Sequence, residues 1–187
     1  MKGYFGIGVE GVSKAINVGT LFRTAHAFGA SFVFTLRAHY NQRQGFLSDT
    51  SDTPRSVPTY DFADLDAFRL PHGCRLIGVE ISDQAIELPS FRHPRQAAYI
   101  LGSEREGLSS DVQSICDYVV KIPMQFSVNL GIAGALIMYD RQISLGRHAP
   151  RPVAEGGPTE ALVVPPFGEP IYKHKERKRE RAAQARK

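Results

Sequence analysis

The sequence predicts an α/β domain built on a mainly parallel sheet that is flanked by helices. Two observations carry this prediction. Short apolar runs alternate with segments of helical periodicity, and several of those runs lack polar alternation, as strands covered on both faces do. Hydrophobic residues make up 42% of the 187 residues, which is enough apolar material to bury one core.

Five apolar runs are expected to be the strands. They are bounded by Gly, Pro or polar residues, and each has the length of an ordinary strand. These runs are Tyr4–Val9, Ser31–Leu36, Arg75–Glu80, Ala97–Leu101 and Tyr118–Ile122.

Four segments are expected to be helical. In the first, Asn17 is the predicted N-cap, Gly29 is placed to end the helix, and the apolar residues recur at helical spacing: Val18, Leu21, Phe22, Ala25 and Phe28. The other three are Asp61–Phe68, Ser109–Cys116 and Leu130–Leu145. The last is apolar almost all round in its first half and is therefore expected to be buried there. The polar segment Asn41–Pro58 is expected to be a loop.

The composition changes after residue 146. Residues 147–170 are rich in Pro and Gly and are expected to form a linker or an extended arm. Residues 171–187 hold eight Lys or Arg and two Glu, a charge of +6, which leaves −2 of the net +4 for residues 1–170. The expected organisation is thus a folded domain at 1–146, the linker or arm, and a basic C-terminal tail.

A second basic stretch lies inside the domain, because no Asp or Glu occurs from Gly11 to Ser48. That stretch contains four cations: Lys14, Arg23, Arg37 and Arg43. Together with the tail it indicates a polyanionic partner. A merely solvated, solubilising surface is the alternative left open.

Composition also excludes several classes. No apolar run approaches the length needed to span a bilayer, and the N-terminus does not resemble a signal peptide. The two cysteines, Cys74 and Cys116, form no CxxC pair, so neither a cysteine metal site nor a disulfide is expected. A cytoplasmic protein without a metal is the expectation.

The segment Gly6–Gly11 spells GxGxxG. A dinucleotide site would need a full strand before it, a helix opening on it and an acidic residue about 20 positions later. Only five residues precede Gly6, and the next acidic residue is Asp49. A glycine-rich strand and turn is favoured over a nucleotide-dependent oxidoreductase.

Three other segments are more informative. Residues 17–25 place Arg23 on a helix but off its apolar stripe. Residues 99–108 end a strand in a polar turn that is flanked by glycines and contains Glu104. Residues 121–135 lead from a strand through a loop into a helix rich in small residues. Taken singly, each has an ordinary structural interpretation: a surface arginine, a connecting loop and a helix cap.

Taken together and in order, the three segments resemble the SpoU/TrmH family of the SPOUT superfamily. The pattern N-x-G-x-x-x-R-T-A matches Asn17–Ala25, and G-x-E-x-x-G-L matches Gly102–Leu108. I-P-M, followed by S-x-N and a helix rich in small residues, matches Ile122–Ala135. The resemblance covers about residues 4–145. One departure is that Gly131 stands where the family usually has a second serine.

The resemblance implies an RNA methyltransferase that transfers the methyl group of S-adenosylmethionine to a ribose 2′-hydroxyl of tRNA or rRNA. It implies a SPOUT-type catalytic domain with a C-terminal trefoil knot, and a homodimer. The implied catalytic residues are Asn17, Arg23, Glu104, Ser127 and Asn129. The implied cofactor-binding residues are Leu101, Gly102, Ser103, Glu104, Gly107, Ile122, Met124, Asn129, Leu130 and Ala133. RNA is expected to contact Lys14, Arg23, Arg37 and Arg43.

Arg23 is the key residue of the family's mechanism. An arginine is a poor base because its guanidinium stays protonated. We expect Arg23 to stabilise the developing alkoxide and an adjacent phosphate, as fixed donors do in an anion hole. Two alternatives remain open: a non-catalytic RNA-binding protein on the same scaffold, and a SPOUT enzyme that methylates a base.

Overall fold

The computed structural model describes residues 3–39, 56–103, 105–146, 148–149, 151–152 and 155–157. By its internal contacts the chain divides into two compact units, Met1–Gly146 and Arg147–Lys187. The basic tail and most of the expected linker lie outside the described residues. None of the described helices is long and apolar enough to cross a lipid bilayer.

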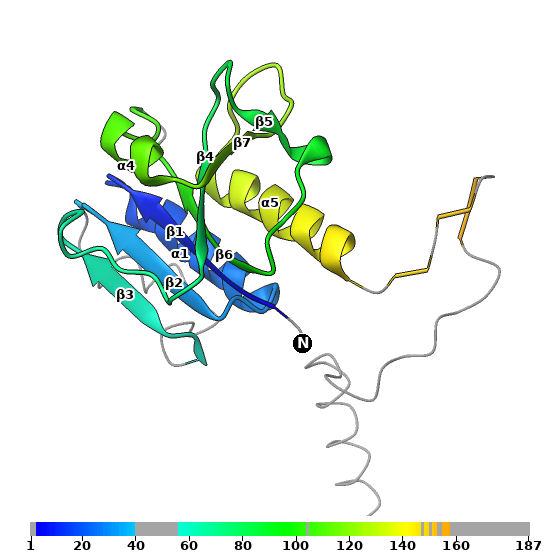
Figure 1. Ribbon diagram of the computed structural model, residues 1–187, viewed down its shortest axis with the longest axis horizontal. Helices are drawn as coiled ribbons and strands as arrows, with labels where there is room; N and C mark the ends of the chain where they lie inside the picture. Colours follow the sequence, from blue (N-terminus) through cyan, green and yellow to red (C-terminus); the bar gives the residue numbers. More distant parts are fainter. Residues whose placement is uncertain are drawn as a thin grey trace, which may run out of the picture. The chain divides into compact units, whose positions relative to one another are not determined.

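The first unit is built on a seven-stranded sheet with the order β3-β2-β1-β6-β4-β7-β5 (Figure 1). Each neighbouring pair of these strands is parallel. The strands are β1 Tyr4–Glu10, β2 Phe32–Leu36, β3 Thr59–Phe62, β4 Arg75–Val79, β5 Ile86–Glu87, β6 Gln96–Leu101 and β7 Tyr118–Lys121. All five expected strands are therefore confirmed to within a residue or two at each end, and the sheet is parallel as predicted.

Helices cover both faces of the sheet. One core packs against α1 (Ala15–Ala27) and α5 (Leu130–Leu145), through residues such as Leu21 and Ile137. The other core lies on the opposite face with α4 (Ser110–Ile115) and holds Phe34 and Val112. A short 3-10 helix, Leu88–Ser90, follows β5. The predicted helices at 109–116 and 130–145 are confirmed.

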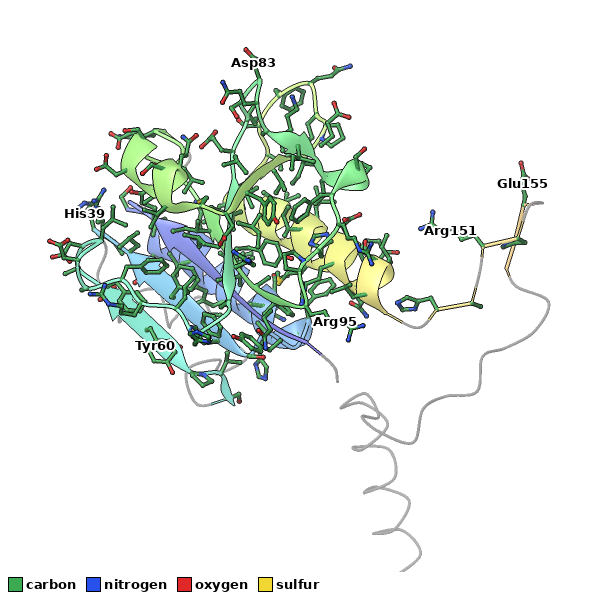
Figure 2. The ribbon with its side chains drawn as sticks, viewed as in Figure 1. His39, Tyr60, Asp83, Arg95, Arg151 and Glu155 are labelled. Atoms are coloured by element: carbon green, nitrogen blue, oxygen red, sulfur yellow. The ribbon has the colours of Figure 1, made fainter. Side chains whose placement is uncertain are left out.

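The helix predicted at Asp61–Phe68 is wrong. Its first residues belong to β3, which pairs with β2, and the rest forms turns. Backbone pairing with β2 fixes this segment as a strand, with Thr35 opposite Asp61 and Leu36 opposite Phe62. Just after β2, the amide of Arg37 donates to the carbonyl of Phe62 at 2.9 Å. Tyr60 on this edge strand is half exposed and stacks on Phe62 (Figure 2). Long-range pairing has overridden a local pattern.

The glycines of GxGxxG lie in a strand, as favoured over a dinucleotide site. Gly6 and Gly8 are inside β1, under the rings of Phe32 and Phe34, where an added Cβ would collide with those side chains. Gly11 follows the strand with a φ of +63°, a value that suits glycine. Gly6 and Gly8 therefore serve close packing between strands, and Gly11 serves the turn between β1 and α1.

The expectation that the first half of α5 is buried on all sides is wrong. One side of the helix is buried, through residues such as Gly134, Ile137 and Met138. The opposite side is an exposed apolar stripe made of Ile132, Leu136, Tyr139 and Ile143. The spacing of four, three and four residues places these side chains on one helix face, so the core of the domain covers only the other side of the helix.

Candidate active site

A cavity of about 390 Å³ lies where β4, β6 and β7 end and α5 begins. Carboxyl ends of parallel strands are the usual place for ligands in sheets of this type. The cavity is lined by Val79, Glu80, Ile81, Leu101, Gly102, Ser103, Gly107, Lys121, Ile122, Met124, Ser127, Val128, Asn129, Leu130 and Ala133. The second and third informative segments of the sequence thus meet at one place.

Nine of the ten residues expected to bind a cofactor line this cavity, and Ser127 lines it too. The tenth, Glu104, lies outside the described residues. The lining also contains five residues that were not named as cofactor-binding residues: Val79, Glu80, Ile81, Lys121 and Val128. A signal for Glu80 was present, because it is the last residue of an expected strand and carboxyl ends of strands meet at one edge of a parallel sheet.

One wall of the cavity is a tight turn that we call the cavity loop, the described residues 102–103 and 105–109. The amide of Gly107 donates to the carbonyl of Ser103 at 2.9 Å, which closes the turn. A Cβ at Gly102 would collide with the peptide between Gly107 and Leu108. Gly107 itself has a φ of +68°. These constraints explain why the motif has glycines at both ends.

Glu80 supports this loop from the end of β4. Its Oε2 accepts a hydrogen bond from the amide of Leu108 at 2.6 Å, and its Oε1 accepts one from the amide of Ile81 at 2.8 Å. The carboxylate also lies where a Cβ on Gly107 would have to go. Lys121, across the cavity on β7, donates from Nζ to the carbonyl of Ser82 at 3.3 Å. Both charged groups of the lining are therefore tied to backbone.

Asn129 connects the cavity to the first helix. It is the N-cap of α5, since its side chain accepts from the amide of Gly131 at 2.8 Å. Its Nδ2 also donates to Oδ1 of Asn17 at 3.2 Å. Asn17 is buried in the first turn of α1. The prediction that Asn17 caps α1 is wrong, because the cap is Lys14, three residues earlier, and that cap has no side-chain hydrogen bond.

The cations expected to meet RNA have different surroundings. Arg23 and Lys14 are exposed on and before α1, and Arg23 is not among the residues that line the cavity. Arg37 pairs with Glu10 at 3.3 Å and with Asp111 at 3.8 Å, and it has an unusual φ of 52° for a residue other than glycine. These ion pairs engage its guanidinium within the domain. Arg43 lies outside the described residues.

The described residues that line the cavity include no cysteine. The described residues contain no group of three or more His, Cys, Asp or Glu that could hold a metal ion. Burial raises the pKa of Cys116 to about 12, so the thiol stays protonated at neutral pH and is a poor nucleophile. The cavity offers apolar walls, backbone groups, a few hydroxyl and amide side chains and the two charged groups of Glu80 and Lys121, which is the composition of a small-molecule pocket.

Comparison with known proteins agrees with this geometry. The model of the SpoU rRNA Methylase family matches residues 5–139. The tRNA (guanosine(18)-2′-O)-methyltransferase TARBP1 of Mus musculus is 30% identical over 145 residues, which cover 72% of this chain and 9% of that protein. The tRNA (guanosine(18)-2′-O)-methyltransferase of Escherichia coli K12 is 27% identical over 139 residues, covering 72% and 61%. The chain spans less than two thirds of either relative.

A solved structure has the same fold. The SpoU methyltransferase AviRb from Streptomyces viridochromogenes, in complex with the cofactor AdoMet, superposes with a TM-score of 0.65 at 23% identity. The match covers 77% of this chain and 62% of that one. The described part of the domain therefore shares its parallel, helix-flanked sheet with a structure of known topology.

Proposed function

The chain belongs to the SpoU rRNA methylase family, and from this premise we propose that it transfers the methyl group of S-adenosylmethionine to a ribose 2′-hydroxyl of tRNA or rRNA. One observation carries the proposal. Residues from two motifs that are about 20 positions apart in the sequence, including Gly102 and Ile122, line a single cavity, to which a third motif is linked through Asn17. The named activities of the curated relatives, both tRNA guanosine 2′-O-methyltransferases, point the same way.

The residues present fit S-adenosylmethionine. A cavity of about 390 Å³ is within the usual range for small-molecule sites. Leu101, Ile122, Met124 and Leu130 supply apolar walls for an adenine ring, and the cavity loop supplies backbone donors and acceptors. When bound, S-adenosylmethionine supplies a methyl group on a positively charged sulfur, and its transfer to the 2′-oxygen releases a neutral thioether and the hydroxyl proton.

Four side chains are proposed to act on the RNA and the cofactor. Asn129 is held by the N-terminus of α5 and by Asn17, so its position is fixed before any ligand binds, and Ser127 lies beside it in the lining. Arg23 supplies fixed donors for the developing 2′-alkoxide and a neighbouring phosphate. The proton leaves to that phosphate or to water. Glu104 is proposed to act in the same site, as a catalytic and cofactor-binding residue.

A homodimer is part of the proposal, and it accounts for the position of Arg23. On α1, Ile16, Thr20 and Arg23 recur along one exposed side. Thr20 lies against the start of α5, because a Cβ on Gly131 would meet it. This side of α1 thus continues toward the apolar stripe of α5. A second copy that covers the stripe would bring its own Arg23 to the interface. This could supply the arginine that the described lining of the cavity does not contain.

Several further features stay predictions. They include the trefoil knot and the assignment of residues 1–146 as the catalytic domain. The proposal of an RNA substrate is accompanied by three others. These are a cytoplasmic location, a linker or arm at residues 147–170 with a basic tail at 171–187, and RNA contacts at Lys14, Arg23, Arg37 and Arg43. Arg37 is the weakest of the RNA candidates because its guanidinium already serves Glu10.

Three measurements test the proposed activity. Calorimetric titration with S-adenosylmethionine should give saturable binding, whereas an RNA-binding protein without catalysis would give none. Incubation with tRNA and rRNA and the methyl-labelled cofactor, followed by digestion to nucleosides, should place the label on ribose; label on a base would favour the base-directed alternative. Arg23→Lys should lose most of the activity, and activity near that of the unmodified protein would refute the need for a planar guanidinium.

A further inference from the structure

Two glutamates outside the three motifs, Glu10 and Glu80, hold the cavity loop from two different strands. We propose that they are positioning residues: by fixing consecutive backbone amides of the loop they keep the cavity in the shape that binds the cofactor. The inference rests on the proposed function for the identity of the ligand. The contacts that carry it belong to this chain alone.

Glu80 holds the first of the two amides. It follows β4, lines the cavity and accepts from the amide of Leu108 at 2.6 Å. Its second oxygen is fixed by the amide of Ile81 at 2.8 Å. The carboxylate fills the space beside Gly107 that a side chain would occupy. The Glu80 carboxylate can therefore occupy this position only because residue 107 has no side chain.

Glu10 holds the next amide. It is the last residue of β1 and is only 4% exposed. Its Oε2 accepts from the amide of Ser109 at 2.9 Å, and its Oε1 accepts from the hydroxyl of Ser109 at 2.6 Å and from Arg37 at 3.3 Å. A buried carboxylate is tolerated when it is supplied with donors in this way. Glu10 does not line the cavity, so any effect it has on a ligand passes through Ser109.

The two carboxylates therefore fasten Leu108 and Ser109, where the cavity loop passes into α4. Ser109 is also the N-cap of α4 and accepts from the amide of Val112 at 3.3 Å. Hydrogen bonds to an ionised acceptor are stronger than those between neutral groups. Upstream, the loop is closed on itself by the bond between Ser103 and Gly107. Removal of a carboxylate should leave the strands intact and loosen this wall of the cavity.

The test compares Glu10→Gln and Glu80→Gln with the matched controls Asp83→Asn and Glu87→Gln. Each substitution removes one negative charge and keeps the side chain's shape. Asp83 lies exposed at the tip of the turn after β4 (Figure 2), and Glu87 is exposed on β5. A glutamine side chain has one acceptor oxygen, whereas the Glu80 carboxylate accepts from two amides and the Glu10 carboxylate accepts from three donors. Both test variants therefore lose at least one hydrogen bond, whereas the controls lose none to the loop.

Two readouts are needed. Hydrogen exchange by NMR on the protein without ligand should show faster exchange of the Leu108 or Ser109 amide in the test variants only. Calorimetry and kinetics should show S-adenosylmethionine binding weakened by about tenfold or more, the effect of ~1.4 kcal/mol, with the KM for the cofactor raised and kcat at saturating cofactor largely kept. A merely structural role would lower kcat and thermal stability without this split.

The outcomes are distinguishable. Faster exchange together with weaker cofactor binding supports the proposal. Unchanged exchange at both amides overturns it, and so does faster exchange with unaltered cofactor binding. If the unmodified protein binds no S-adenosylmethionine, the proposed function fails, and the part of the inference that concerns the cofactor fails too. The exchange result still decides whether the carboxylates hold the loop. Because Glu10 is buried and its variant has the greater risk of misfolding, Glu80→Gln provides the second, partly exposed test.

Discussion

Asn129 donates a hydrogen bond to Asn17 across 112 positions of sequence, with Nδ2 and Oδ1 3.2 Å apart. The bond joins the start of α5 to the first turn of α1, and so joins the first motif to the third. Asn129 at the same time caps α5 through the amide of Gly131. One side chain thus fixes the helix that lines the cavity and ties it to the helix that carries Arg23.

The two bonds of Asn129 can be separated by substitution. Asn129→Ala removes both and should lower the free energy of unfolding by roughly 1–2 kcal/mol. Asn129→Asp keeps an acceptor for Gly131 and loses the donor to Asn17, so it should cost less stability yet still reduce methyl transfer. Urea unfolding and a transfer assay measure the two effects. A double-mutant cycle with Asn17→Ala should give a coupling energy of about 0.5 kcal/mol or more; strict additivity would contradict the link.

His93 should make the stability of the domain depend on pH. Its side chain is fully buried, with Nδ1 2.6 Å from the hydroxyl of Tyr99 and Nε2 2.8 Å from Oδ2 of Asp140. Burial lowers its pKa; Asp140 opposes this shift and the nearby Arg141 adds to it. The folded state therefore favours the neutral ring, while the unfolded chain takes up a proton below about pH 6.5.

The sign of that dependence follows from proton uptake. The unfolded state binds more protons than the folded state as the pH falls through about 6.5. The contribution of His93 to the free energy of unfolding is therefore greatest above that pH and decreases below it. Denaturant unfolding at pH 7.5 and at pH 5.5 should show the loss. His93→Gln, which cannot titrate, should be less stable at pH 7.5 but lose less between the two values. An equal loss in both proteins would show that other groups cause it.

The exposed stripe of α5 should be a contact between two copies of the chain. Leu136 lies in its middle, on the side away from the core. Leu136→Glu should convert a dimer to monomers in sedimentation velocity, because a charge buried in an apolar interface is unfavourable. Ser144→Glu, at an exposed polar position of the same helix, is the control and should stay dimeric.

The same variant tests where the arginine of the reaction comes from. Leu136 does not line the cavity, so Leu136→Glu should still bind S-adenosylmethionine in calorimetry. If the partner copy supplies Arg23, the monomer should nevertheless lose most of its methyl transfer. A monomer that keeps full activity would place Arg23 and the cavity of one chain in a single site.

The basic tail should contribute to RNA binding through phosphate contacts. Deletion of residues 171–187, which removes a charge of +6, should weaken the binding of tRNA or rRNA and make the binding less dependent on salt, because each phosphate contact releases counterions. Filter binding across a salt series measures the slope. A slope equal to that of the full chain would refute the contribution.

The sequence by itself determined the fold class and most of the site. Strands that are covered on both faces are apolar along their whole length, and this pattern can be recognised without knowing which strands pair. It predicted β1, β2, β4, β6 and β7. The cavity residues of the second and third motifs could be named because each directly follows a buried strand, and parallel strands bring their carboxyl ends to one edge.

Only the tertiary structure decided the features that depend on contacts distant in sequence. The edge strands β3 and β5 exist because their neighbours offer free peptide groups, and the local pattern at 61–68 indicated a helix instead. Asn17 proved to be a partner of Asn129 rather than a cap. The sequence placed Glu10 just after one expected strand and Glu80 at the end of another. Their partners, Ser109 and Leu108, lie 99 and 28 positions further along the chain. Local pattern specifies which residues are buried in a strand or helix, whereas the partner of a polar side chain is set by which distant backbone the fold brings within hydrogen-bonding distance.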